Sequence, residues 1–315
     1  MMTSFDIRIV FMGTPEFSAT CLKALADAGY NVVLSVTQPD KPVGRKHIIT
    51  PSPVKVLSKE LGIPVYQPAT FKAEGSEDEI VNAKPDLIVT AAYGKILPQR
   101  VLDIPKMGAL NVHGSLLPKR RGSAPVQRSV LEGDEITGVT IMKMDAGMDT
   151  GDILSIADYN IPENMHSSVL MDELAKLGAD LLVKTIPDYL SGSITPVAQN
   201  NDEATYSPPI EAMEGLIDWT ETARSVHNRV RALSEWPGAY TFINGKKLKI
   251  YDSVLADADT EGKSAGYILK PDKKTLIVVC GTGAIKILTL QQEGGKVLPA
   301  SDIAHNIAEG TMLGN

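Results

Sequence analysis

The chain has 315 residues, of which 43% are hydrophobic and 22% charged, and its formal net charge is −7. The apolar fraction excludes wholesale disorder, and the length favours two domains. No apolar run approaches the roughly 20 residues of a membrane-spanning helix, and the first residues lack the features of a secretory signal. Two cysteines cannot build a disulfide framework or a zinc site. We therefore expect a cytoplasmic monomer without a membrane partner.

The first part of the chain alternates short apolar runs with amphipathic segments. Such alternation predicts an α/β fold with a Rossmann-like, doubly wound, mainly parallel sheet, in which ligands bind beyond the carboxyl ends of the strands. A long helix would close this domain, which we place at residues 1–190. The expected strands are 7–12, 32–37, 86–92, 109–113 and 139–144, and the expected helices are 15–28, 54–61, 124–131 and 167–190.

Residues 191–209 are polar, contain proline and glycine and show no sustained period, so we interpret them as a linker. In residues 210–315 one expected helix is followed by short strands with turn signals between them. This pattern predicts a small β-barrel of the oligonucleotide-binding (OB) type. The expected helix is 221–233, and the expected strands are 239–243, 247–251, 265–269, 275–279 and 285–290.

Two polar residues stand at the end of one expected strand. Asn111 and His113 are two positions apart, so they project from the same face of the sheet into the region where α/β folds bind ligands. An amide can donate to a developing oxyanion, and an imidazole can move a proton near neutral pH. Packing or helix capping would explain such a pair equally well if it stood alone.

A turn-rich acidic loop, residues 144–152, follows the next expected strand and contains Asp149. It could be an ordinary Asx-turn loop. A carboxylate close to an imidazole would instead fix its tautomer and favour its cation. Metal binding is the weakest alternative, because the loop lacks the regular alternation of an EF-hand and has no histidine or cysteine pair beside it.

Charge by itself does not indicate nucleic-acid binding, because residues 1–190 and 191–315 both carry more acidic than basic side chains. Any polyanion would have to contact local basic clusters, each of which could equally be a solvated surface. The clusters are Lys41 with Arg45 and Lys46, residues 119–121, and Arg224, Arg229 and Arg231 with Lys246, Lys247 and Lys249.

The segment from Asn111 through His113 to the Ser-Leu-Leu-Pro run at 115–118, with Asp149 in its Asp-Thr-Gly loop, resembles the 10-formyltetrahydrofolate-dependent formyltransferase family. Residues 11–17, 38–45, 51–55, 92–98, 121–125 and 236–240 are similar to the members that act on methionyl-tRNA. The resemblance runs in order along nearly the whole chain. It implies formyl transfer from 10-formyltetrahydrofolate, without a metal, to the α-amino group of initiator methionyl-tRNA.

The resemblance also implies roles for individual residues. Asn111 and His113 would hold the oxyanion of the acyl transfer, and Asp149 would orient His113. The folate pocket would involve Asp86, Tyr93, Ser115, Leu116, Leu117 and Pro118, although plain core packing is an alternative for the two leucines. Arg45 would contact tRNA near its acceptor end, with Lys41, Lys46, Lys247 and Lys249 as further tRNA contacts.

Two other functions stay open at this point. One is a formyltransferase acting on a sugar amine or another small amine, or a formyltetrahydrofolate hydrolase, either of which would share the Asn111, His113 and Asp149 set. The other is an RNA-binding protein without catalysis. Aromatic residues make up only 5% of the chain, and the C-terminal strands show no strong stacking platform, which argues against a protein that only binds RNA.

Overall fold

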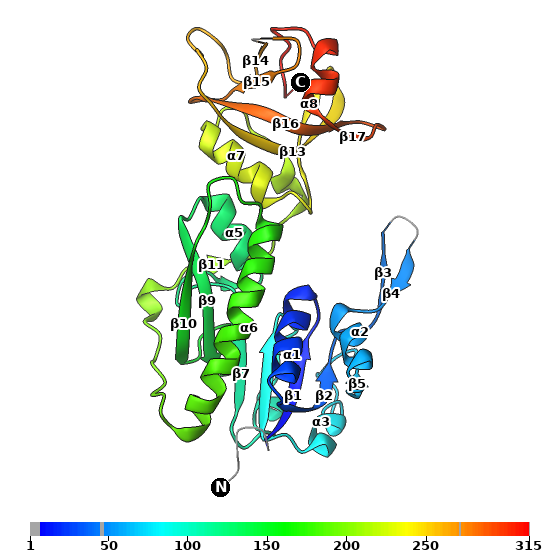
Figure 1. Cartoon of the computed structure of the whole chain (residues 1–315), viewed down its shortest axis with the longest axis vertical. Coiled ribbons are helices and arrows are strands. Elements are labelled where there is room, and N and C mark those ends of the chain that lie inside the picture. Colours follow the sequence, from blue (N-terminus) through cyan, green and yellow to red (C-terminus); the bar gives the residue numbers. More distant parts are fainter. Residues whose placement is uncertain (1–6, 45–46, 271, 315) are drawn as a thin grey trace. The chain divides into compact units, whose positions relative to one another are not determined.

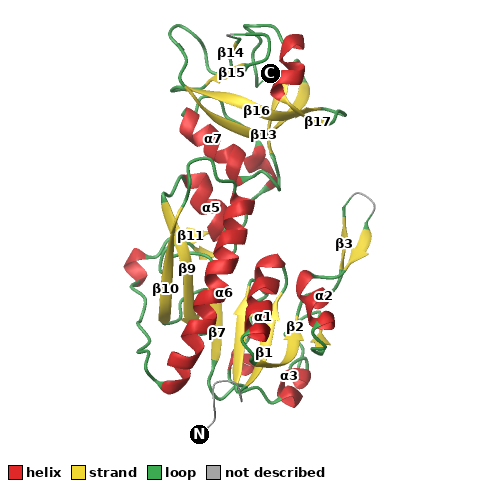
Figure 2. Cartoon of the chain, in the orientation of Figure 1, coloured by secondary structure: helices red, strands yellow, loops and turns green. Residues whose placement is uncertain are grey.

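A computed structural model describes residues 7–44, 47–270 and 272–314 of the chain. These residues form two compact units (Figures 1 and 2). The first unit runs to Pro125 and also includes Ile136–Asn160 and Met171–Ser207. The second consists of Val126–Glu135, Ile161–Leu170 and the chain from Pro208 onward. Among the described helices, none combines the length and apolar character needed to cross a membrane.

The first unit is built on a mixed sheet in the order β10-β9-β7-β6-β1-β2-β5. The five strands from β7 to β5 are parallel, and β9 and β10 are antiparallel additions at one edge. The expected Rossmann-like, mainly parallel sheet is therefore confirmed. Its strands are β1 (Arg8–Gly13), β2 (Asn31–Val36), β5 (Val65–Tyr66), β6 (Leu87–Ala91), β7 (Ala109–His113), β9 (Ile136–Lys143) and β10 (Ile153–Asn160).

Helices cover both faces of this sheet, because its central strands are apolar on both sides. α1 (Glu16–Asp27) packs against β1 and β6, and α2 (Pro53–Glu60) packs against α1 and β2. Ser52 caps α2 by accepting a hydrogen bond from the Lys55 N–H, as expected for serine before an N-terminal proline. The other helices of the unit are α3 (Asp78–Ala83), α4 (Gln99–Leu102) and most of α6 (Ser167–Ser191).

Several elements of this unit escaped the sequence prediction, among them β5, α3 and α4. The segment expected as a loop forms a two-stranded hairpin of β3 (Lys41–Val43) and β4 (Ile48–Thr50). β10 was not predicted, because Leu154 is its only buried residue and the other positions are half-buried or exposed, so the segment lacks a continuous apolar run. Within the segment interpreted as a linker, β11 (Tyr206–Ser207) pairs in parallel with β8 (Arg121–Gly122).

The second unit contains a curled antiparallel sheet in the order β12-β13-β16-β15-β14, with β17 also paired to β16. It is the barrel-type sheet that the sequence predicts, and its central strands β13 and β16 are longer than expected. Its strands are β12 (Ala239–Ile243), β13 (Lys246–Ala256), β14 (Ile268–Leu269), β15 (Leu276–Val279), β16 (Ala284–Gln292) and β17 (Val297–Pro299), and its helices include α5 (Pro125–Glu132), α7 (Ala223–Ala232) and α8 (Ala300–Ile303).

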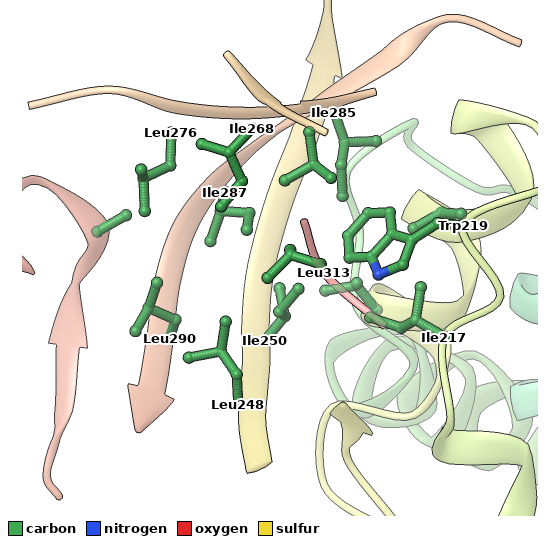
Figure 3. Close-up of a cluster of buried hydrophobic side chains, with 14 of the residues drawn as sticks. Ile217, Trp219, Leu248, Ile250, Ile268, Leu276, Ile285, Ile287, Leu290 and Leu313 are labelled. Atoms are coloured by element: carbon green, nitrogen blue, oxygen red, sulfur yellow. The ribbon is translucent and has the colours of Figure 1, made fainter. Parts of the chain in front are cut away.

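The concave side of this sheet holds the core of the second unit (Figure 3). Leu248 and Ile250 alternate along β13 toward the core, as expected from the two-residue period of a strand. Trp219 packs beside them, and its indole N–H donates to the buried Thr241 hydroxyl at 2.9 Å. The largest aromatic residue of the core thus keeps its polar atom paired, which removes the cost of burying it.

A buried histidine lies outside this apolar core. His227 on α7 contacts the Ser253 hydroxyl at 3.0 Å and the Glu163 carbonyl oxygen at 3.3 Å. Burial lowers the pKa of His227 below its usual 6.5, with the nearby Arg231 and Arg224 acting in the same direction and Glu163 opposing them. The folded chain therefore holds this histidine neutral where the unfolded chain begins to protonate it.

The lowered pKa predicts a loss of stability in mild acid. Because the unfolded state binds the extra proton first, the contribution of His227 is present above its unfolded pKa and declines as the pH falls below it. We expect the free energy of unfolding to fall more between pH 7 and pH 5 in the parent protein than in His227→Gln. Urea denaturation at both pH values measures this difference, and parallel losses in the two proteins would contradict it.

Candidate active site

Asn111 and His113 occupy the carboxyl end of β7 and share one face, as the sequence predicts. Thr90 on the neighbouring β6 is level with Asn111, and its hydroxyl donates to Asn111 Oδ1 at 2.7 Å. This bond fixes the amide so that Nδ2 carries its two hydrogens away from Thr90. Among the described residues, none accepts a hydrogen bond from Asn111 Nδ2. A half-buried, oriented donor is therefore available at the ligand-binding edge of the sheet.

The His113 ring is 5% exposed and lies between two acceptors. Its Nε2 is 3.1 Å from the Arg120 carbonyl oxygen, and its Nδ1 is 3.7 Å from Asp149 Oδ1. A carbonyl oxygen can only accept, so Nε2 carries the hydrogen and donates it to Arg120. The backbone of Arg120, and not Asp149 as we expected, thus selects the tautomer of neutral His113 and leaves the Nδ1 lone pair facing Asp149.

Asp149 lies in the loop between β9 and β10, with a φ of 56°. This left-handed conformation is uncommon for residues other than glycine, although aspartate tolerates it better than most. Its Oδ2 accepts the Gly122 N–H at 2.8 Å, which holds the other carboxylate oxygen toward His113. The loop thereby joins the carboxylate to the pair on β7, residues that lie more than thirty positions earlier in the chain.

Hydrogen bonds from a buried threonine hold the Ser-Leu-Leu-Pro turn, residues 115–118, in place. The buried Thr140 hydroxyl donates to the Ser115 carbonyl at 2.7 Å and accepts the Leu117 N–H at 3.1 Å. The Ser115 side chain is fully buried and donates to the Lys119 carbonyl, and Leu117 is 3% exposed. Leu116 and Pro118 are half-buried. Among these four predicted folate contacts, Leu116 and Pro118 are thus the ones whose side chains can reach a ligand.

The two earlier predicted folate residues lie at opposite ends of β6. Asp86 precedes the strand at its amino end, where its Oδ2 accepts the Arg8 N–H at 2.9 Å. Because ligands bind at the carboxyl end, the structure does not bring Asp86 to Asn111 and His113. Tyr93 follows the strand at the carboxyl end, but its ring is buried against Phe71. The backbone carbonyl oxygen of Tyr93 accepts hydrogen bonds from the Thr14 hydroxyl and the Gln38 side-chain amide. Tyr93 therefore contributes to this edge of the sheet through its backbone.

Of the predicted tRNA contacts near residue 45, the structure describes Lys41, which begins the β3–β4 hairpin. Lys41 is exposed at the start of β3, and its ammonium group donates to Gln38 Oε1 at 2.9 Å. Asp40 anchors the base of the hairpin through Lys55 at 2.6 Å and Gln67 at 2.8 Å. These two hydrogen bonds hold the pKa of the Asp40 carboxyl below its usual value. Arg45 and Lys46 lie outside the described residues.

The remaining predicted tRNA contacts lie on the outer face of the second unit's sheet. Lys247 and Lys249 alternate along β13 and are paired in register with Phe242 and Tyr240 on β12. The Lys247 ammonium group is 3.6 Å from the centre of the Tyr240 ring, and the two rings meet edge to face with centres 6.0 Å apart. We call these four residues the lysine–aromatic face. The expectation that the C-terminal strands show no strong stacking platform stays a prediction, because Lys247 already covers one face of the Tyr240 ring.

The arginines of α7 do not join this face. Arg229 donates to Glu221 at 2.7 Å and Arg224 donates to Glu163 at 2.6 Å. Arg231 is buried and donates to Asn228 through two of its nitrogens. The expectation that all these cations form one basic surface is therefore wrong, because local acidic and amide partners already engage the helix arginines.

Comparison with known proteins shows the family of the chain. The family model described as formyl transferase matches residues 7–186, and the model described as formyl transferase, C-terminal domain, matches residues 209–307. The chain belongs to the formyl transferase family. It is similar to methionyl-tRNA formyltransferases of Listeria innocua, 46% identical over 96% of this chain and 95% of the relative, and of Bacillus subtilis, 43% identical over 98% of each.

Solved structures share the fold at low identity. An N-formyltransferase from Helicobacter canadensis in complex with folinic acid and dTDP-3-aminofucose has a TM-score of 0.68 and 20% identity, covering 89% of this chain and 98% of that chain. HypX from Aquifex aeolicus in complex with tetrahydrofolic acid has a TM-score of 0.63 and 17% identity. This chain matches over 94% of its own length and spans 46% of that HypX chain.

Several site residues were missed by the sequence analysis. Thr90 and Thr140 are buried hydroxyls inside apolar strands, a pattern that could have suggested side chains with a specific partner. The Arg120 carbonyl and the Gly122 N–H are backbone groups, which leave no signal in residue type. Gln199 lies in the segment that we interpreted as a linker, and nothing in its sequence surroundings indicates its partners.

Proposed function

We propose that the chain transfers a formyl group from 10-formyltetrahydrofolate to the α-amino group of methionine on initiator methionyl-tRNA, for translation initiation in the cytoplasm. The relatives at 43–46% identity that carry this activity in their names match along nearly their whole length. Within this proposal residues 1–190 carry the chemistry, 191–209 connect, and 210–315 bind tRNA. A monomer stays a prediction, which light scattering tests.

The proposed formyl transfer rests on one observation, the grouping of Asn111, His113 and Asp149 at the carboxyl edge of the sheet. An oriented amide donor, an imidazole with a free nitrogen and a carboxylate within ion-pair distance of it are what acyl transfer to an amine requires. The amine of the acceptor is itself the nucleophile, so the protein need not supply one. In agreement, both cysteines are buried, and burial raises the pKa of each thiol to about 12.

Each of the three residues has a distinct task in this mechanism. Asn111 Nδ2 donates to the formyl oxygen, which gains negative charge as the amine adds to the carbonyl carbon. His113 Nδ1 accepts the proton that the amine loses, because Nε2 already donates to Arg120. Asp149 Oδ1, at 3.7 Å, stabilises the resulting imidazolium. The same Nδ1–H can then return the proton to the leaving nitrogen.

10-Formyltetrahydrofolate supplies the activated formyl group when it is bound. The residues at this edge suit such a flat, partly apolar molecule. Leu116 is half-buried in the turn after β7, and Ile96, in the segment after β6, is 85% exposed. The Nδ2 of Asn111 adds a polar group at the same edge of the sheet, and apolar side chains with a few polar groups are a common composition for a small-molecule site.

A direct assay separates this function from the alternatives. The purified chain is incubated with 10-formyltetrahydrofolate and charged initiator tRNA, a nucleotide-linked amino sugar, or water alone. We expect rapid formylation of the methionyl-tRNA and at most slow release of formate. Turnover of the amino sugar with no reaction of the tRNA would instead support a sugar-amine transferase, and fast hydrolysis in all three mixtures would support a hydrolase.

The lysine–aromatic face predicts an effect on tRNA binding. Cations contact phosphates and rings stack on bases, so this face suits tRNA. In the double variant Lys247→Ala, Lys249→Ala we expect a KM for tRNA raised about tenfold at physiological salt and a kcat close to the parent at saturation. The slope of log affinity against log salt should become shallower by about 2, since each lost phosphate contact removes nearly one released counterion.

Lys263 provides a matched control for this pair. It also stands over a tyrosine ring in the same unit, with its ammonium group 5.0 Å from the centre of Tyr267, but it lies outside the lysine–aromatic face. Lys263→Ala should leave both the KM for tRNA and the salt slope close to those of the parent. Equal salt slopes for the parent and the double variant would remove the face from the tRNA-binding surface.

A further inference from the structure

The loop that carries Asp149 depends on one side chain outside it. Gln199 Nε2 is 2.9 Å from the Asp149 carbonyl oxygen and 2.6 Å from the Gly151 carbonyl oxygen. An amide nitrogen has two hydrogens and can serve both acceptors. The backbone of Gly151 passes close to the end of β9, because a Cβ atom there would collide with the Lys143 carbonyl oxygen, so no residue with a side chain fits at this position. Gln199 therefore holds the backbone on either side of Thr150.

Arg121 fixes the orientation of Gln199. Its Nε and Nη2 donate to Gln199 Oε1 at 3.1 and 2.8 Å, and Nη2 also donates to Asn201 Oδ1 at 2.9 Å. A guanidinium group has donors only, so the amide oxygen must face it and the amide nitrogen must face the Asp149 loop. Arg121 is 2% exposed. Its rotamer is thus set by packing, and the Gln199 amide cannot flip without losing four hydrogen bonds.

The backbone beside Arg121 acts on the same carboxylate. Gly122 donates to Asp149 Oδ2, and β8 is held by β11, where the Arg121 N–H donates to the Thr205 carbonyl at 2.8 Å. A Cβ atom on Gly122 would lie 2.6 Å from the Ser207 carbonyl oxygen. The backbones of β8 and β11 are therefore so close at this point that only glycine fits. The segment from Gln199 to Ser207 therefore constrains Asp149 twice, through a side chain and through β8.

We infer that Gln199 and Arg121 are positioning residues for the reaction, which set the distance between the Asp149 carboxylate and His113 Nδ1. This inference rests on the catalytic role proposed above for Asp149. The uncommon φ of Asp149 makes such support necessary, because the loop has no regular structure of its own between Lys143 and Ile153. A shift of about 1 Å at a reacting group can lower a rate about 100-fold.

Gln199→Glu tests the inference, because it keeps an acceptor for Arg121 and loses both donors to the Asp149 loop. We expect kcat to fall about 10- to 100-fold, with KM values for both substrates within about twofold of the parent. Asn201→Ala is the matched control, since it removes one bond to the same guanidinium without touching the loop, and its kcat should stay close to the parent. Thermal melting of each variant reports folding.

A double-mutant cycle distinguishes positioning from general destabilisation. In the Asp149→Ala background the change at Gln199 should have almost no further effect on kcat, because the group that it positions is gone. An unchanged kcat in Gln199→Glu, or the same fold loss with and without Asp149, would overturn the inference. If Asp149→Ala itself turned over like the parent, the proposed catalytic role would fail instead. Gln199→Met, which places no carboxylate beside the carbonyls, replaces Gln199→Glu if the latter does not fold.

Discussion

Replacement of Asn111 by alanine should lower kcat for formyl transfer about 100- to 1,000-fold. Nδ2 of Asn111 is a donor that has no acceptor among the residues that the structure describes, and loss of one oxyanion donor has this order of effect in other acyl transfers. The KM for tRNA should change little, because the amide acts on the reacting oxygen and not on the nucleic acid. Steady-state kinetics with both substrates varied measure the two constants.

The variant Asn111→Asp tests whether Asn111 acts as a hydrogen-bond donor. Aspartate has nearly the same shape and can still accept from the Thr90 hydroxyl, but it has no N–H to donate. We expect its kcat to be at least as low as that of the alanine variant. Both variants should melt close to the parent, since the side chain is only half-buried at the end of β7. A parent-like kcat in the aspartate variant would show that Asn111 does not stabilise the oxyanion as a donor.

Asp149→Asn should lower kcat about 100- to 10,000-fold, the range for loss of general acid–base assistance. The asparagine oxygen can keep the bond from the Gly122 N–H, and this leaves an N–H₂ group facing His113 Nδ1. That donor would occupy the lone pair that we propose accepts the proton, and the charge that stabilises the imidazolium would be missing. The geometry is preserved while the proton transfer is blocked.

Single-turnover kinetics with bound methionyl-tRNA isolate this step from binding and product release. The rate of formyl transfer should fall by the full factor, whereas the dissociation constant for tRNA should match that of the parent. Asp145→Asn serves as the control in the same loop, because Asp145 bonds to Gly147 and Thr150 and is exposed. A chemical step as fast in Asp149→Asn as in the parent would exclude Asp149 from the proton transfer.

The strand-end pair shows what local pattern can predict. Asn111 and His113 share a face because side chains alternate along any strand, and the apolar run before them predicts the strand itself. The curled sheet of the second unit followed in the same way from short strands and turn residues. The β3–β4 hairpin did not, because its exposed Ile48 and Ile49 pack against no core that a periodic pattern could reveal.

The charged residues show what a local sequence pattern cannot predict. Arg224, Arg229 and Arg231 look like a basic cluster in the sequence, yet ion pairs and burial give each a local partner. Lys247 and Lys249 look the same in the sequence, and the register of β13 against β12 places them beside aromatic rings. Which cations can bind a partner depends on these neighbours, and residue type does not encode them.

The sequence by itself determined the α/β class, the barrel-type second unit, and the pair at the end of β7, because strand alternation and turn chemistry act over a few residues. Only the tertiary structure decided that Arg120 sets the His113 tautomer, that Arg121 orients Gln199, and that Gln199 holds the Asp149 loop. These contacts join residues up to 78 positions apart. They form only when the folded chain brings the strands and loops together.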